Sequence, residues 1–275
     1  MTPEVTPETT RVAIIAGAGA LPAALAPCLD RPLICALDGY APQGLTPDMT
    51  FRVERLVPFF AALEQAGVNT VTFAGAVQRP RLDPALFDPA TAQLVPRLFA
   101  AMQAGDDATL RAVIALFEEA GFAITGTADI APDLVPAAGL LTGALTDQDE
   151  KDADRAAVIT QALGAVDVGQ GCVVAQGLCL ATEALPGTDA MLAQVADLPA
   201  ALRPDPGRGR GLFYKAAKPG QDLRIDLPTL GPATVAAVAR AGLGGIAWQA
   251  GHVICLDRPA MIAAAERAGL FLWAR

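Results

Sequence analysis

Side chains suited to phosphate chemistry concentrate in two stretches of the chain, residues 183–192 (EALPGTDAML) and 215–231 (KAAKPGQDLRIDLPTLG). Carboxylates with cations nearby favour magnesium-assisted chemistry, because Mg²⁺ binds carboxylates and substrate oxygens while lysines balance the remaining charge. The candidate residues are Glu183, Thr188, Asp189, Lys215, Lys218, Arg224, Asp226 and Thr229.

Asp226 is the most informative of these residues, because it stands between Ile225 and Leu227 in an otherwise apolar run. It lies too far before Pro232, where a helix is expected to begin, to cap that helix. Two interpretations stay open. Either the carboxylate holds a metal ion or the attacking water, or it is structural and accepts hydrogen bonds from nearby loop amides. The other candidates also have structural explanations, such as a helix N-terminal acid or a solvated lysine.

A glycine-rich turn, AGAGALPAAL at 16–25, lies between an expected strand and an expected helix. Backbone N–H groups of Gly17, Gly19 and Ala20 could approach a phosphate there. Asp38 stands about where a dinucleotide-binding fold places its ribose-binding acid, but Pro22 takes the place of the third glycine of that fingerprint. The turn is therefore a phosphate or nucleotide site, a tight turn without a ligand, or part of an NAD site.

Two further positions could meet a phosphate or a metal ion. Arg79 follows an expected strand, at the end where open α/β sheets bind ligands; its planar guanidinium either clamps a phosphate or is simply solvated. Asp106 and Asp107 open an expected helix, where a carboxylate caps free N–H groups. Capping accounts for one of them, so Asp107 could instead point toward a metal ion.

Composition limits the class of protein. The chain has 275 residues, of which 53% are hydrophobic and 18% charged, as is typical of a folded globular protein. A net charge of −9 argues against nucleic-acid binding, which needs a basic surface. The sequence has no apolar run of membrane-spanning length and no secretory signal pattern, so a cytosolic location is expected. The single histidine, His252, makes a two-histidine metal site impossible and histidine chemistry an unfavoured explanation.

Alternating strand and helix patterns predict the elements that position these residues. After an expected flexible tail over 1–10, strands alternate with helices over 11–135, which predicts parallel pairing and a Rossmann-like α/β domain. Prolines and a charge cluster over 136–150 predict a linker. Residues 151–275 are expected to form a second, catalytic domain of the α/β or α+β class.

The pattern of the second domain predicts individual elements. We expect a helix beginning about Asp149, a single strand over 172–184 and another strand over 223–231.

Seven ordered motifs together resemble the LpxI family of UDP-2,3-diacylglucosamine pyrophosphatases. They are IIAGAGALP, FAGAVQRP, GDDATLRAV, VGQG, EALPGTDAML, KAAKPGQDLRIDLPTLG and VARAGLGGIAWQAG. The resemblance covers nearly all of residues 11–275. It implies an enzyme of lipid A biosynthesis in Gram-negative bacteria, with two linked domains that hold the lipid product in a cleft between them.

The resemblance also implies an activity and residue roles. The family uses Mg²⁺ to hydrolyse UDP-2,3-diacylglucosamine to UMP and 2,3-diacylglucosamine 1-phosphate, with attack at the β-phosphorus, and the aspartate of its DLPT motif is essential. That aspartate is Asp226 here. The residues expected in catalysis are Asp226, Lys215 and Thr229; those expected to bind Mg²⁺, or Mn²⁺ in its place, are Asp226, Asp107, Glu183 and Asp189; those expected to bind substrate are Gly17, Gly19, Ala20, Arg79, Thr188 and Lys218.

A lipid-linked nucleotide-sugar substrate implies transient, peripheral contact with the inner face of the inner membrane. A homodimer is the simplest oligomer that the sequence leaves open. Two other functions also remain. An NAD-dependent oxidoreductase rests on the glycine-rich turn and Asp38, and a non-catalytic nucleotide-sugar binding protein would bind the substrate without consuming it. Neither explains the acids and lysines of the second half.

Overall fold

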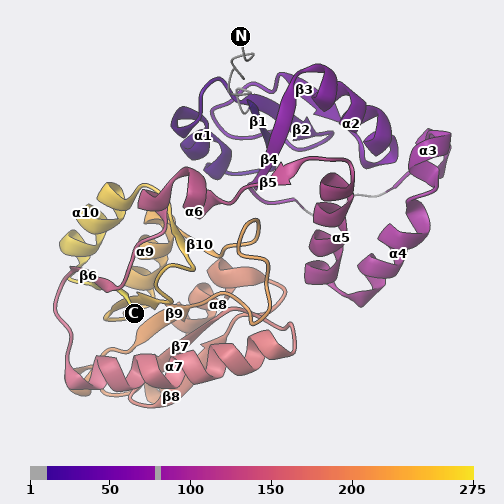
Figure 1. Cartoon of the computed structure of the whole chain (residues 1–275). Helices are drawn as coiled ribbons and strands as arrows, with labels where there is room; N and C mark the ends of the chain where they lie inside the picture. The colour runs from indigo at the N-terminus through magenta and orange to yellow at the C-terminus, as the bar shows by residue number, and fades with distance from the viewer. Residues whose placement is uncertain (1–10, 78–81) are drawn as a thin grey trace, which may run out of the picture. The chain divides into compact units, whose positions relative to one another are not determined.

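The structure is a computed structural model that describes residues 11–77 and 82–275 (Figure 1). Its contacts divide the chain into two compact units, one ending at Ala131 and the other formed by Pro132–Arg275. Each unit buries a hydrophobic core of its own. None of the described helices combines the length and the apolar character needed to cross a bilayer.

Within the described residues, the first unit contains a parallel sheet of five strands in the order β3-β2-β1-β4-β5. The chain starts at the central strand, adds strands on one side and then crosses to the other, which is the doubly wound arrangement. The Rossmann-like prediction is therefore confirmed. The strands are β1 (Arg11–Ala16), β2 (Leu33–Leu37), β3 (Met49–Phe51), β4 (Val68–Ala74) and β5 (Ala123–Ile124).

Helices of the first unit pack their apolar faces on this sheet. Phe117 of α5 is buried at the centre of an aromatic cluster, with ring centroids 4.8 Å from Phe60 and 5.2 Å from Phe73. Large rings in edge-to-face contact fill the space between helix and sheet. The helices are α1 (Leu21–Leu25), α2 (Leu56–Gln65), α3 (Pro89–Ala92), α4 (Val95–Ala104), α5 (Asp106–Glu119) and α6 (Thr127–Ile130).

The second unit is built on a mixed sheet of six strands in the order β6-β13-β11-β9-β7-β8, together with the short parallel pair β10-β12, again counting described residues. β9, β11 and β13 run parallel, while β6 and β7 flank them in the antiparallel direction. The strands are β6 (Gly139–Thr142), β7 (Gly171–Ala175), β8 (Leu178–Thr182), β9 (Leu212–Lys215), β10 (Thr229–Leu230), β11 (Gly245–Trp248), β12 (Ile254–Cys255) and β13 (Phe271–Ala274).

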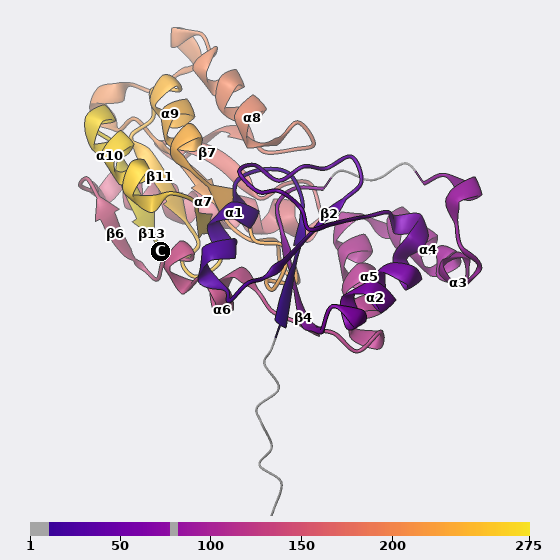
Figure 2. The same cartoon turned by 90° about the horizontal axis from the view of Figure 1, so that it is seen from above.

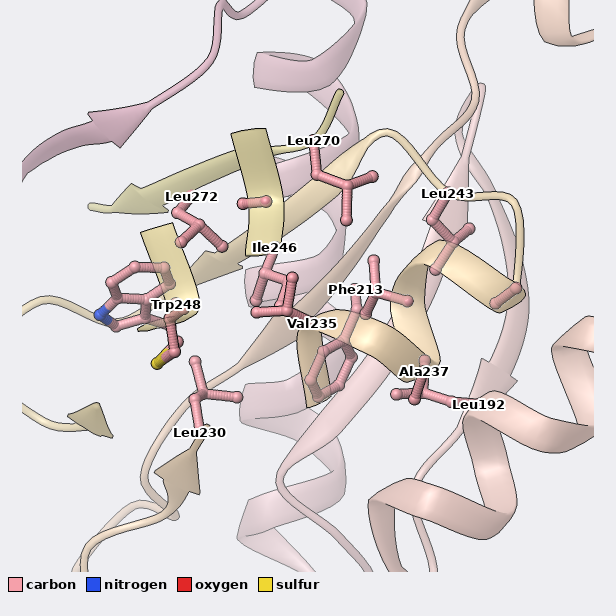
Figure 3. Packing of buried hydrophobic residues seen from close by; sticks show 14 of the residues in the cluster. Leu192, Phe213, Leu230, Val235, Ala237, Leu243, Ile246, Trp248, Leu270 and Leu272 are labelled. Carbon is pink, nitrogen blue, oxygen red and sulfur yellow. The ribbon is translucent and has the colours of Figure 1, made fainter. Parts of the chain in front are cut away.

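Helices cover both faces of the second sheet. On one face α7 (Asp147–Ala165) packs Ala153 and Ala156 against β9. The other face is covered by α8 (Gly187–Ala196), α9 (Pro232–Arg240) and α10 (Arg258–Ala268), grouped together in Figure 2. Figure 3 shows the core on that side, where Phe213, Ile246 and Trp248 meet apolar side chains of these helices. The unit is thus a three-layer α/β structure.

Residues 136–150, expected as a linker, instead belong to the second unit. β6 pairs with the last strand, with Thr142 opposite Leu272. α7 begins at Asp147 behind a capping box in which Thr146 and Asp149 bond each other's backbone N–H groups. The charge cluster of this segment belongs to the capped start of α7, and the segment lacks a regular hydrophobic pattern because it contains the edge strand β6.

The expected single strand over 172–184 is a hairpin. β7 and β8 run antiparallel and are joined by Gln176 and Gly177, which have φ values of 51° and 79°. Two residues with positive φ make the tight turn that hairpins favour. Asp152 of α7, which is fully buried, accepts hydrogen bonds from both turn amides at 2.8 and 2.7 Å.

The expected strand over 223–231 is also different, because only Thr229 and Leu230 pair in a sheet. Before them the chain turns back on itself: the amides of Ile225 and Asp226 both donate to the carbonyl oxygen of Asp222. Asp226 therefore lies in a turn, where its side chain is not committed to one face of a sheet.

Candidate active site at the carboxyl edge of the second sheet

The topology of the second unit brings most candidate residues to one edge of its sheet. β9, β11 and β13 end there together, since Lys215 pairs with Trp248 and Trp248 with Ala274. β7 begins at this edge, because Gly171 lies opposite Lys215, and β8 ends there. Loops beyond the carboxyl ends of parallel strands are where α/β proteins usually bind ligands.

Lys215, Glu183 and Thr188 form a buried polar cluster at this edge. The Lys215 Nζ lies 3.4 Å from both carboxylate oxygens of Glu183 and donates to Thr188 Oγ1, which in turn donates to Glu183 Oε1 at 3.0 Å. The side chains of Lys215 and Glu183 are only 6% and 10% exposed. The sequence places these residues 32 positions apart. They meet because Gly171 of β7 lies opposite Lys215 of β9 and accepts a hydrogen bond from the N–H of Glu183, which follows β8.

The glycines of the VGQG motif make room for this cluster. A Cβ atom on Gly169 would lie 2.1 Å from the Glu183 carbonyl oxygen, and one on Gly171 would lie 2.7 Å from Glu183 Oε2. A side chain at position 169 would displace the backbone that carries Glu183, and one at position 171 would displace the Glu183 carboxylate itself. The motif therefore has a steric role in holding the carboxylate beside Lys215.

Burial lowers the pKa of Lys215 below its ordinary value, while the neighbouring Glu183 carboxylate acts in the opposite direction. Asp189, in the first turn of α8, adds a smaller effect of the same sign as Glu183. The ammonium group is thus balanced within the protein, as buried charges usually are. Lys215 is therefore the counter-ion of Glu183, and its predicted catalytic role stays a prediction.

Asp226 is held by a glutamine. Gln221 Oε1 accepts a hydrogen bond from the Lys218 backbone N–H at 2.9 Å, and Gln221 Nε2 donates to Asp226 Oδ2. Because a backbone N–H can only donate, it fixes which end of the amide is oxygen, so the NH₂ group must face the carboxylate. The Asp226 carboxylate therefore accepts a hydrogen bond from a side-chain amide, and its predicted roles in catalysis and metal binding stay predictions.

A cavity of about 440 Å³ opens beside this glutamine, on the α7 side of the sheet edge. Its walls come from the second half of α7, from Tyr214 and from the loops after β9 and β11. The polar side chains among its lining residues are Thr160, Gln161, Tyr214, Lys218, Gln221, Gln249 and His252. Since β-strand side chains alternate, Tyr214 faces this cavity while Lys215 faces the buried cluster on the opposite side.

The remaining candidates of the second unit have local partners. Lys218 Nζ pairs with Asp167 at 2.6 Å. Arg224 pairs with Asp222 at 2.7 Å. Thr229 is exposed at the start of β10, and its hydroxyl donates to the Leu227 carbonyl at 3.5 Å. The predicted catalytic role of Thr229 and the predicted substrate contacts of Thr188 and Lys218 stay predictions.

The donor set at this edge decides which carboxylates suit a magnesium ion. Among described residues, the histidines, cysteines and acids nowhere gather in threes around a point where a metal could sit. Mg²⁺ in phosphate-handling proteins needs only one or two carboxylates, with substrate oxygens and waters completing its shell. Asp226 is a carboxylate of the kind such a site uses, with one oxygen bonded by Gln221. The Glu183 carboxylate is engaged by the buried ammonium group of Lys215 and by Thr188.

In the first unit, the glycine-rich turn is explained by close backbone contact. Gly17 donates its N–H to Ala74, while Ala18 and Ala76 exchange N–H···O bonds of 2.8 and 2.9 Å. A Cβ atom on Gly17 would lie 2.6 Å from the Ala76 carbonyl oxygen. These contacts support the tight-turn interpretation for Gly17. Phosphate contacts of Gly19 and of Ala20, which precedes α1, stay predictions.

The other candidate residues of the first unit are Asp38, Asp107 and Arg79. The Asp38 carboxylate forms an ion pair with Arg52, so the acid on which the NAD interpretation rests is already engaged. Asp107 is the second residue of α5, as predicted for a helix start. Arg79 lies outside the described residues.

Three polar residues of this edge escaped prediction as site residues: Gln221, Gln249 and His252. Glutamine has no charge to draw attention to it, and a lone histidine is usually structural. Their common signal is position, since all three follow strands that end at this edge.

Comparisons with known proteins agree with this architecture. The model of the LpxI N-terminal domain matches residues 11–134, and that of the LpxI C-terminal domain matches residues 137–273. The chain is 40% identical over 270 residues to the UDP-2,3-diacylglucosamine pyrophosphatase LpxI of Caulobacter vibrioides, covering 95% of this chain and 96% of that protein. The chain therefore belongs to the LpxI family.

Proposed function

We propose that the protein hydrolyses the diphosphate of UDP-2,3-diacylglucosamine, with Mg²⁺, to UMP and 2,3-diacylglucosamine 1-phosphate. The observation that carries this proposal is the 40% identity, over nearly the whole of both chains, to a protein named for that pyrophosphatase activity. The acids and cations at the carboxyl edge of the second sheet are in keeping with it.

In the proposed reaction, a water oxygen bonds to phosphorus, the bond from that phosphorus to the bridging oxygen breaks, and a water proton is released. A dianionic diphosphate repels nucleophiles, so the developing negative charge has to be stabilised. Asp226 would hold Mg²⁺, which when bound neutralises phosphate charge. Gln221 fixes the carboxylate orientation by donating to Oδ2.

Turnover of UDP-2,3-diacylglucosamine by the whole protein tests this function. Release of UMP and the lipid monophosphate is expected with Mg²⁺ and is expected to stop with EDTA. Asp226→Asn keeps the size of the side chain but removes its charge, and should lower kcat by about 100-fold or more. Asp197→Asn, at an exposed position after α8, is the matched control. Near-normal turnover by Asp226→Asn would remove Asp226 from the site.

The point of attack is a separate part of the proposal. Attack at the β-phosphorus or at the α-phosphorus yields the same products, but it places the water oxygen in different ones. We expect that in ¹⁸O-labelled water the label enters the lipid monophosphate, and mass spectrometry of both products reads this directly. Label in UMP would assign the attack to the α-phosphorus instead.

A substrate carrying two acyl chains also suggests peripheral contact with a membrane on the cytoplasmic side. Leu185, fully exposed at 99%, follows β8, and the exposed Val166 and Val168 precede β7, so all three lie at the carboxyl edge. Leu185→Glu should reduce flotation of the protein with anionic vesicles. Leu202→Glu, at another exposed leucine that precedes β9, is the control. Equal flotation of both variants and the parent protein would count against this contact.

A further inference from the structure

We infer that the 440 Å³ cavity beside Gln221 binds the pyrimidine ring of a uridine nucleotide, recognised by Gln249 and His252. The cavity lies within the range typical of small-molecule pockets, roughly 300–1,000 Å³. This inference rests on the proposed function, because it assigns one part of that substrate to one part of the second unit.

Gln249 offers the cavity a donor. Its Oε1 accepts a hydrogen bond from the Ala217 backbone N–H at 3.2 Å. A backbone N–H cannot accept, so this contact assigns the oxygen and leaves the NH₂ group as the other end of the amide. Gln249 directly follows β11, and its own N–H donates to the carbonyl of Lys215, which anchors the residue at the sheet edge.

His252 offers the cavity an acceptor. Its Nδ1 lies 2.9 Å from the Ala250 carbonyl oxygen. Since a carbonyl can only accept, Nδ1 carries the hydrogen, and Nε2 of the neutral ring is then an acceptor. The two residues stand three positions apart in one loop, so the cavity has a donor and an acceptor from neighbouring side chains.

A uracil ring is complementary to this pair. Its imide edge presents an N3–H donor between two carbonyl acceptors, so a carbonyl can accept from Gln249 while N3–H donates to His252. Tyr214, which is largely buried, also lines the cavity and adds an aromatic ring to its wall.

The charges of the lining residues favour the base over the diphosphate. Lys218 is the only lysine or arginine among the lining residues, all of which the structure describes, and its ammonium group is paired with Asp167. A doubly charged diphosphate would meet little positive charge there. Gln221 lines the cavity and also holds Asp226, so a nucleotide whose base occupies the cavity has the Asp226 loop beside it for its phosphates.

Calorimetric titration of the whole protein with UMP and with N3-methyl-UMP tests the inference without changing the protein. Methylation removes the donor that His252 is expected to accept. We expect affinity for N3-methyl-UMP to be about tenfold lower, the usual effect of losing one buried hydrogen bond. In His252→Phe the two nucleotides should bind alike, because the acceptor is already absent.

Gln249→Glu tests the other proposed hydrogen bond, from Gln249 to a uracil carbonyl, by changing the protein. The variant keeps an oxygen for the Ala217 N–H but turns the donor facing the cavity into an acceptor, so UMP affinity should also fall about tenfold. Gln194→Glu, at an exposed site on α8, adds the same charge away from the cavity and should bind UMP normally.

The outcomes separate this inference from the proposed function. Hydrolysis of the lipid nucleotide with UMP affinity unchanged by N3 methylation and by Gln249→Glu would overturn the cavity assignment alone. The expected binding pattern without hydrolysis would overturn the proposed function and keep the cavity as a uridine site.

Discussion

At the scale of single residues, Gln221 connects the backbone of Lys218 to the carboxylate of Asp226. Both ends of its amide have a defined partner, so it fixes one oxygen of Asp226. A group that orients a catalytic side chain affects turnover more than substrate affinity, because a displacement of about 1 Å can cost about 100-fold in rate.

Gln221→Leu should therefore lower kcat by about tenfold to 100-fold with little change in KM. Gln221→Glu keeps an acceptor for the Lys218 N–H but places a second carboxylate against Asp226, so that one of the two retains a proton to higher pH. The pH profile of kcat should then shift to higher pH for Gln221→Glu but not for Gln221→Leu. If both variants change KM alone, Gln221 contacts the substrate and does not orient Asp226.

The ion pair of Lys215 and Glu183 gives a second prediction at this scale. Lys215→Met leaves Glu183 as an unpaired buried charge, and loss of one partner of such a pair costs about 3–5 kcal/mol of unfolding free energy. The double variant Lys215→Met/Glu183→Gln removes both charges and should recover most of that loss. Chemical denaturation of the three proteins measures the difference. A double variant no more stable than the single one would show that the charge imbalance is not the cause.

At the scale of elements, the sequence predicts best where one kind of element continues for many residues. The buried runs of β1 and β2 and the amphipathic pattern of α5 identify these elements correctly. The hairpin β7-β8 is not predicted, because its turn contains Gln176, and glutamine, unlike glycine, rarely adopts a positive φ. Its turn is stabilised from α7 by Asp152, a contact across 24 residues that no local pattern reveals.

In the candidate site, too, local sequence patterns are predictable and contacts between distant residues are not. Asp226 can be selected from its sequence context, because an acid in an apolar run is unusual. Its partner Gln221 and the pairing of Glu183 with Lys215 cannot, since they depend on which strands become neighbours. The turn at Asp222 likewise depends on backbone hydrogen bonds within the loop and not on its hydrophobic pattern.

The hairpin leads to a prediction for Asp152. This carboxylate accepts from Gln176, Gly177 and Gln148, so Asp152→Ala leaves two partly buried turn amides without their acceptor. The expected loss of stability is about 2–3 kcal/mol, typical for hydrogen bonds to a charged group. Thermal unfolding measures it, with Asp154→Ala, at an exposed position on the same helix, for comparison. Equal stability of the two variants would contradict this role.

At the scale of the whole molecule, both units bury cysteines whose thiols are hard to ionise. Burial raises the pKa of Cys35 in the first unit and of Cys255 in the second to about 12, from an ordinary value of 9.0. Between about pH 9 and pH 12 the unfolded chain has lost thiol protons that the folded chain retains. The free energy of unfolding therefore falls as pH rises. The thiol contribution is complete below about pH 9 and is lost as pH rises toward 12.

Cys255→Ala should accordingly reduce the dependence of stability on pH above about pH 9. Cys28→Ala, at an exposed position, is the matched control. Denaturation midpoints measured between about pH 8 and pH 10 decide the matter, because only the buried-site variant should show a shallower slope. Parallel curves for both variants would mean that other groups dominate alkaline unfolding.

The pairing of β6 with β13 has a consequence for protein synthesis. These strands join residues 139–142 to residues 271–274, across most of the second unit. A ribosome delivers residues in order, so the first unit can fold while its successor is still being translated. The second sheet cannot close until residue 274 has left the exit tunnel. Until then β6 has no partner, and a nascent chain stalled before that residue would offer chaperones an incomplete sheet.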